Sequence, residues 1–157
     1  MHILFISTHS LATNPRLVKE MNLALENNID VTVLCCSFDN WSKDNNEKIK
    51  KSFGSSINYY EVPGNRKPFL PWFTSSVVSV LSTTVGFFFK KNVALLSLTS
   101  NKRSWLLLQH LKKIKEKPGL AVAHNPGSFY PAMLFSKKNK IPFGVDLQYT
   151  NEKPEDK

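Results

Sequence analysis

Short apolar runs alternate along this chain with longer segments in which apolar residues recur at helical spacing. The runs predict five strands, at residues 3–6, 31–36, 57–62, 120–123 and 143–147. The longer segments predict helices at residues 14–27, 69–89, 100–117 and 130–138, and the polar stretch 38–56 predicts a surface excursion with some helix. Continuous apolar strands that alternate with helices are typical of a parallel sheet. The pattern therefore predicts an α/β fold, with a parallel sheet of about five strands flanked by helices.

The first strand, loop and helix carry the clearest local signals. Asn14 is a good N-cap for the helix, and Pro15 fits its first position, where a missing N–H group costs nothing. Asn27 and Asn28 predict its end, because asparagine tolerates the left-handed conformation. In open α/β sheets, ligands bind outside the carboxyl ends of the strands. The loop at residues 7–14 is therefore the first place where we expect a functional site.

The segment Phe69–Phe89 is uncharged and long enough to suggest a membrane span. Its seven Ser or Thr residues and its one-sided pattern indicate an amphipathic helix instead. The predicted apolar face consists of Phe73, Val77, Val80, Leu81, Val85 and Phe88. Packing of this face on its own domain is the favoured interpretation. The alternative is an interfacial position on an anionic membrane, supported by Trp72 and by the flanking basic pairs Arg66-Lys67 and Lys90-Lys91.

Charge is unevenly distributed along the chain, which has 157 residues, the length of one domain, and a net charge of +9. Between Val62 and Val145 the only acidic residue is Glu116, against thirteen Lys or Arg residues. Solvated lysines on helix faces are one interpretation, and a basic face for anionic lipid or a phosphorylated substrate is the other. Nucleic acid is not expected as a partner, because aromatic residues are not interleaved with the lysines and no binding motif is present.

The two cysteines, Cys35 and Cys36, are adjacent in a predicted core strand, where successive side chains point to opposite faces. A disulfide between them is not expected, and buried thiols fit a reducing cytoplasm. The first residues enter a strand directly and lack the basic and apolar regions of a signal peptide. We therefore expect a cytoplasmic protein, with a peripheral position at the inner face of the membrane as an option.

Three polar residues near strand ends are candidates for a site. His124 follows the fourth strand, where its imidazole could contact a sugar hydroxyl or a phosphate or act as a base; the alternative is a structural histidine. Arg16 opposes the dipole in the first turn of its helix, which favours a role in holding an anion; the alternative is a salt bridge within the domain. Asp146 is either a site carboxylate or a solvated loop acid. If both strands are central, His124 and the loop 7–14 lie at the same edge of the sheet, where His9 is a weaker candidate.

Motifs of several common enzyme classes are absent. The chain lacks GxGxxG, GxxxxGK[ST], HExxH and GxSxG. The absence argues against a classical dinucleotide site, a nucleoside-triphosphatase, a zinc protease and a serine hydrolase.

Two segments resemble a known family. NPRLVKEMNLALENNIDVTVL resembles the start of GT-B glycosyltransferases of the family-4 type, in which a Pro-Arg pair opens a helix and a strand of the form hxVxVL follows. LAVAHNPGSFYPAMLFSKKNKIPFGVDLQ is similar to that family's strand with a HxHN-like turn, followed by a helix and an IPhhhDh strand. The resemblance covers nearly the whole chain. It implies a Rossmann-like N-terminal half of a GT-B fold at residues 1–148, with residues 149–157 as a polar tail or the start of a missing region.

The resemblance also implies a function. Such enzymes transfer a sugar from a nucleotide-diphosphate sugar to an acceptor hydroxyl without an essential metal, and this half holds the acceptor. The acceptor would be a glycan or a lipid-linked saccharide in cell-surface polysaccharide synthesis. By the resemblance His124 is catalytic and lies near the transferred sugar, and the substrate-binding positions are Ser7, Thr8, Asn14, Arg16, Asn125 and Asp146. No cofactor is expected in this domain, because the nucleotide sugar would bind in a C-terminal domain that is absent from this chain, so the chain alone is expected to be inactive. The Gly-Gly pair frequent in the family's first loop is missing here.

A second hypothesis comes from another class of protein. The basic middle of the chain and the helix at residues 69–89 could make it a non-catalytic α/β module that docks on an anionic membrane or on a partner.

Overall fold

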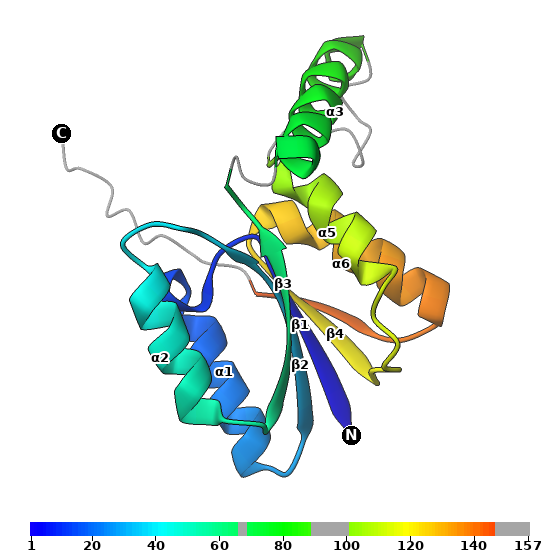
Figure 1. The fold of residues 1–157 in the computed structure, drawn as a ribbon. Coiled ribbons are helices and arrows are strands. Elements are labelled where there is room, and N and C mark those ends of the chain that lie inside the picture. The colour runs from blue at the N-terminus through cyan, green and yellow to red at the C-terminus, as the bar shows by residue number, and fades with distance from the viewer. Residues whose placement is uncertain (66–68, 89–100, 147–157) are drawn as a thin grey trace, which may run out of the picture.

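The computed structural model describes residues 1–65, 69–88 and 101–146 of the chain (Figure 1). In this part a single parallel sheet has the strand order β3-β2-β1-β4-β5. The strands are β1 (His2–Ser7), β2 (Asp30–Ser37), β3 (Ile57–Pro63), β4 (Leu120–His124) and β5 (Phe143–Asp146). The helices are α1 (Pro15–Glu26), α2 (Lys43–Phe53), α3 (Phe69–Phe88), α5 (Arg103–Leu111) and α6 (Pro126–Asn139), with a short 3-10 helix at Leu11–Thr13. The predicted Rossmann-like α/β fold is confirmed.

Helices cover both faces of the sheet. Figure 1 shows α1 and α2 on one face and α5 and α6 on the other. The core under α1 includes Leu17, Met21, Phe5 and Val33, and the core under α5 and α6 includes Leu4, Ile6, Leu34, Leu107 and Ala132. The central strand β1 supplies side chains to both layers, which explains why its sequence is a continuous apolar run.

The predicted signals around α1 are confirmed. The side-chain oxygen of Asn14 accepts a hydrogen bond from the backbone N–H of Leu17 at 3.2 Å, and Pro15 is the first helical residue. Past the end of the helix, Asn28 adopts a left-handed conformation with φ of 54°. These caps place the first turn of α1 directly beside the carboxyl end of β1.

Helix α5 is shorter than the predicted helix at residues 100–117. It begins at Arg103 and ends at Leu111, and Ser100 lies outside the described residues. Leu106 and Leu107 are its buried leucines, together with Leu111. The prediction extended the helix through the lysine-rich residues 112–117, where too few apolar side chains face the core to hold a helix on the sheet.

Helix α3 confirms the predicted helix but not its favoured packing. The apolar residues expected to pack on the domain are exposed: Phe73, Val77, Val80, Leu81 and Val85. The opposite face is the buried one, because Ser75 and Ser82 are 1% and 5% exposed. Figure 1 shows α3 extending away from the sheet beyond the end of α5. Within the described residues, no helix combines the length and the apolar character needed to cross a membrane.

Both cysteines are buried free thiols in β2, as predicted. Strand β5 ends at Asp146, and the predicted continuation at Leu147 lies outside the described residues.

Candidate functional site

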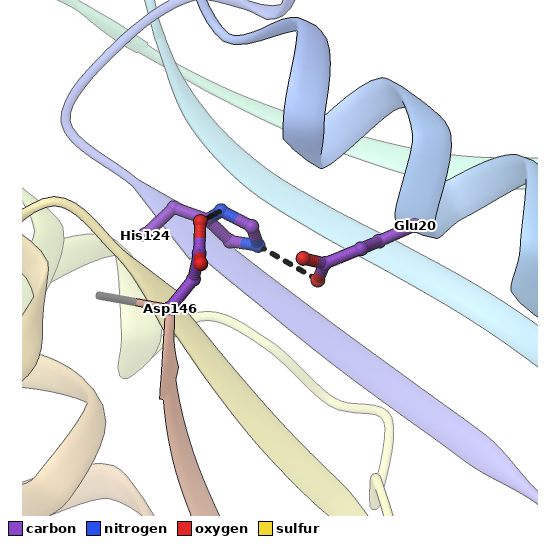
Figure 2. Close-up of side chains that lie close together, drawn as sticks. All are labelled: Glu20, His124 and Asp146. Carbon is purple, nitrogen blue, oxygen red and sulfur yellow. Dashed lines mark ion pairs between the residues drawn. The ribbon is translucent and has the colours of Figure 1, made fainter. Parts of the chain in front are cut away.

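Three side chains from separate elements meet at the carboxyl end of the sheet: Glu20 of α1, His124 of β4 and Asp146 of β5 (Figure 2). The imidazole Nε2 of His124 lies 3.2 Å from Oε2 of Glu20, and its Nδ1 lies 3.2 Å from Oδ2 of Asp146. The β4–β5 register pairs His124 directly with Asp146, and β1 pairs Ser7 with His124. The sheet therefore brings residues that are far apart in sequence to one point.

The imidazole of His124 is enclosed. Its side chain is 1% exposed and packs against the ring of Phe5, with the ring centroids 5.9 Å apart. Neither carboxylate contact has the alignment of a hydrogen bond, and the ring nitrogens have no other partner in the described part of the chain. Ionised carboxylates only accept hydrogen bonds, and an imidazole nitrogen donates only when it carries a proton. The three groups thus form a compact set of proton donors and acceptors, a typical arrangement for positioning a proton at a site.

Arg16 connects this group to the solvent. Its Nη1 donates to Oδ1 of Asp146 at 2.6 Å, and its side chain is 49% exposed while that of Asp146 is 12% exposed. A salt bridge within the domain, the alternative interpretation of Arg16, is therefore present. Asp146 is not a solvated loop acid, because it is largely buried between Arg16 and His124.

A second network joins the two loops that follow β1 and β4. The hydroxyl of Ser7 donates to Oδ1 of Asn125 at 2.9 Å and accepts from the backbone N–H of His9 at 3.0 Å. The amide nitrogen of Asn125 lies 3.3 Å from Nδ1 of His9. The prediction that both loops lie at the same edge of the sheet is confirmed.

Two of the predicted binding residues make contacts only inside the domain. Thr8 is fully buried, and Gly127 at the start of α6 lies so close that an added Cβ would be 2.9 Å from Cγ2 of Thr8. Asn14 is 1% exposed, with its oxygen committed to capping α1. Their observed role is to position the loop, and their role as substrate contacts stays a prediction, as it does for the buried Ser7.

The half-buried His9 lies close enough to Arg103 of α5 to be influenced by its charge. Burial lowers the pKa of the His9 imidazole, and the positive charge of Arg103 lowers it further. Arg103 itself lies over the ring of Phe38, 4.6 Å from the centroid. Arg103 therefore places a positive charge close to His9 at this edge of the sheet.

The three side chains drawn in Figure 2 also have the composition of a metal site. One ligand atom from each of Glu20, His124 and Asp146 lies within 4.8 Å of the other two, a spacing compatible with a divalent cation. The guanidinium of Arg16 competes for Asp146, which weakens the case for a cation. The prediction that the protein needs no metal stays a prediction.

Sequence reasoning missed two residues at this edge of the sheet. Glu20 is four residues after Arg16, so both lie on the same helical face, and that spacing was the available signal.

Asn46 of α2 is 4% exposed, and its side-chain oxygen accepts from the backbone N–H of Leu11 at 3.0 Å while its amide donates to Glu61 at 3.3 Å. It lines a polar hollow of ≈ 280 Å³ beside the ends of β2 and β3, with Ser37, Phe38, Asp39, Lys43, Glu47, Glu61, Pro63 and Asn65. No local pattern marked Asn46.

Comparison with known proteins gives matches in structure and none in sequence. No family model matches the chain, and no curated protein matches it. Solved structures similar to it include TcCGT1 in complex with UDP, at 15% identity and a TM-score of 0.55, covering 93% of this chain. A UGT transferase from Siraitia grosvenorii in complex with UDP has 11% identity and a TM-score of 0.52, covering 93%. The apo structure of UGT2 from Phytolacca americana has 11% identity and a TM-score of 0.51, covering 92%.

The chain spans 28% of the length of TcCGT1 and of UGT2 and 27% of the length of the Siraitia grosvenorii protein. At such identities the likeness concerns the fold. The family-4 assignment drawn from the sequence motifs stays a prediction. The chain has a GT-B-like Rossmann fold, as the sequence resemblance predicted.

Proposed function

We propose that this chain is the acceptor-side domain of a glycosyltransferase that moves a sugar from a nucleotide-diphosphate sugar to an acceptor hydroxyl. The observation that carries the proposal is the convergence of Arg16, Glu20, His124 and Asp146 at the carboxyl end of a GT-B-like sheet. Parallel α/β sheets bind ligands at this edge. Two of the similar structures are complexes with UDP, which agrees with a role in nucleotide-sugar chemistry.

The exposed members of the site are the proposed contacts to the acceptor. Arg16 has a half-exposed guanidinium, and Glu20 has a side chain that is 33% exposed. Asn125 and His9 are partly exposed at the junction of the two loops. Donors and acceptors of this kind suit the hydroxyl groups of a saccharide.

His124 is proposed to act behind these contacts. Because its side chain is 1% exposed, it reaches a substrate through the carboxylates that flank it. Its ring nitrogens lie 3.2 Å from both carboxylates, and it holds Glu20 and Asp146 in place. It is therefore a positioning residue, while Glu20 is the nearest partly exposed base.

Saccharide binding to the isolated chain tests the proposal. A panel of hexose and hexosamine oligosaccharides is titrated into the labelled chain, and the amide signals of His9 and Asn125 are followed by NMR. We expect shifts with dissociation constants of about 1 mM, typical of a few polar contacts. Arg16→Ala should weaken binding about fivefold or more, since it removes an exposed charged donor.

The matched control is Lys51→Ala, which removes an exposed cation in the last turn of α2. It should leave saccharide binding unchanged. The proposal is wrong if no member of the panel shifts these signals, or if Arg16→Ala and Lys51→Ala behave alike.

A further inference from the structure

Helix α3 presents a broad apolar stripe to the solvent. Its most exposed large apolar side chains are Phe69 (65%), Leu70 (70%), Phe73 (48%), Val77 (40%), Val80 (66%), Leu81 (59%) and Val85 (43%). Helical geometry puts all seven on about half of the helix circumference. A stripe of this size on a surface marks an interaction site, because single scattered apolar residues are normal but a contiguous row of seven is not. We call these seven residues the α3 stripe.

The polar groups of α3 are compatible with an apolar environment. Its hydroxyl groups donate to carbonyl oxygens of the same helix three or four residues earlier, at distances between 2.8 and 3.1 Å, from Thr74, Ser75, Ser76, Thr83 and Thr84. A hydroxyl that is satisfied inside its own helix costs little when water is removed. The helix carries no charged residue along its whole length. These five hydroxyl groups could therefore lie in a lipid interface without becoming unpaired.

Positive charge lies beside the first turn of α3, at one end of the stripe. The ammonium group of Lys102 lies over the ring of Trp72, 5.4 Å from its centroid. In the sequence, Arg66 and Lys67 precede α3, and Lys90 and Lys91 follow it. An apolar helical face with tryptophan and basic residues at its borders is complementary to the acyl boundary and the anionic headgroups of a bilayer.

We propose that the α3 stripe docks this chain on an anionic phospholipid surface, with α3 lying in the interface and not crossing the bilayer. The inference rests on α3 and on the basic residues next to it, so it is independent of the proposed glycosyltransferase function. The proposal agrees with the burial of Ser75 and Ser82, which leaves the apolar face of α3 exposed to its surroundings.

Vesicle co-sedimentation of the 157-residue chain tests the proposal. The chain is mixed with vesicles of phosphatidylcholine alone and with vesicles that contain about 30 mol% phosphatidylglycerol. We expect sedimentation with the anionic vesicles, little with the neutral ones, and a marked loss when NaCl is raised from about 0.1 M to about 0.5 M.

Leu81→Asp is the decisive variant, and Leu23→Asp is its matched control. Both leucines are exposed helix residues, at 59% for Leu81 in α3 and 60% for Leu23 in α1, so both substitutions add the same charge at equal exposure. Leu81→Asp should weaken binding to anionic vesicles at least about tenfold, whereas Leu23→Asp should bind like the original chain. Val80→Asp serves as a second variant of the stripe, and unchanged circular dichroism establishes that each variant is folded.

Charge reversal separates the electrostatic part. Lys102→Glu should weaken binding to anionic vesicles about tenfold, while Lys51→Glu should have a smaller effect. The proposal is overturned if the chain does not sediment with anionic vesicles, or if Leu81→Asp and Leu23→Asp lose binding equally. It is also overturned if sedimentation equilibrium without lipid reveals a dimer that Leu81→Asp abolishes, because the stripe would then be an interface between two copies of the chain.

Discussion

Single residues at the carboxyl end of the sheet are constrained by the partners that face them. His124 lies between Glu20 and Asp146, and Arg16 neutralises the far oxygen of Asp146. Removing one member of such a buried group leaves an unpaired charge, which costs more than the pair contributes. The thiols of β2 and the imidazole of His9 are simpler cases, because burial is the largest influence on the pKa of each.

The thiols of Cys35 and Cys36 should be inert in the folded chain. Burial raises the pKa of the Cys36 thiol to about 12, and burial raises the pKa of Cys35 as well. Because the thiolate is the reactive form, we expect almost no reaction with Ellman's reagent at about pH 8 under native conditions. Adding denaturant should release two thiols per chain, which is the cysteine count. Rapid labelling of either cysteine without denaturant would contradict the burial of β2.

The imidazole of His9 should titrate below its ordinary value of 6.5 in an NMR pH titration, because burial and the Arg103 charge both disfavour protonation. Arg103→Gln should raise this pKa, while burial keeps it below the ordinary value. The unfolded chain binds the proton more readily, so the contribution of His9 makes the fold less stable as the pH falls below about 6.5. A His9 pKa that is unchanged in Arg103→Gln would rule out this electrostatic contact.

At the scale of elements, the site depends on how closely the helix starts approach the loops. The beginning of α6 packs against Thr8 after β1 and against Asn101 before α5. The hydroxyl of Ser104 in α5 donates to the carbonyl oxygen of Gly127 at 2.6 Å, which joins the two helix starts. Asn46 attaches α2 to the same loop through the N–H of Leu11. These contacts fix the loops after β1 and β4 relative to the start of α1.

Gly127→Ala tests this close approach. An added Cβ would lie 2.6 Å from Cβ of Asn101 and 2.9 Å from Cγ2 of Thr8, so a neighbour must move. We expect a loss of about 1–3 kcal/mol in the free energy of unfolding, measured by urea denaturation. Gly119→Ala is the control, because its Cβ would meet only the carbonyl oxygen of His2 at 3.7 Å. Equal stability of the two variants would mean that the loops at the site are loosely packed.

At the scale of the whole molecule, the described residues form one parallel sheet with helices on both of its faces. The chain spans 28% of the length of TcCGT1 and of UGT2. The exposed α3 stripe and the site at the sheet edge belong to different parts of the domain, since α3 extends beyond α5 while the site lies among α1, β4 and β5. Membrane docking and acceptor binding could therefore occur together.

The isolated chain is expected to turn over no nucleotide sugar. Under the proposed function, catalysis requires a second domain that closes around the donor and excludes water. The measurement is transfer of a labelled sugar from a panel of nucleotide sugars to the saccharides that bind the chain. Detectable transfer by residues 1–157 would refute the proposed division of labour.

The role of His124 can be measured in any longer product of the same gene that is active. His124→Ala should lower kcat at least about tenfold, a larger effect than the stability loss that follows from removing a buried side chain, because the carboxylates lose their fixed positions. His110→Ala is the control, since the imidazole Nδ1 of His110 lies 3.0 Å from the carbonyl oxygen of Leu106 in its own helix α5. Parallel loss of kcat and stability would assign His124 a purely structural role.

Much of the fold follows from local patterns. The strands were predictable because each is a continuous apolar run, and α1 was predictable because Asn14, Pro15 and Asn28 act on their own backbone. Helix α5 was overestimated because a lysine-rich sequence favours a helix locally, while only packing decides where the helix ends. His124, Arg16 and Asp146 were identifiable because strand ends in a parallel sheet meet at one edge.

The sequence by itself determined the element types, the parallel sheet and the edge where the site lies, because these depend on periodicity and on short-range capping. Only the tertiary structure decided that Glu20 and Asn46 belong to that edge, since contacts between distant segments leave no local signal. The same holds for α3. Its amphipathic pattern is identical whether the apolar face points to the core or to the solvent, and only the packing of the serine face at Ser75 and Ser82 settles the direction.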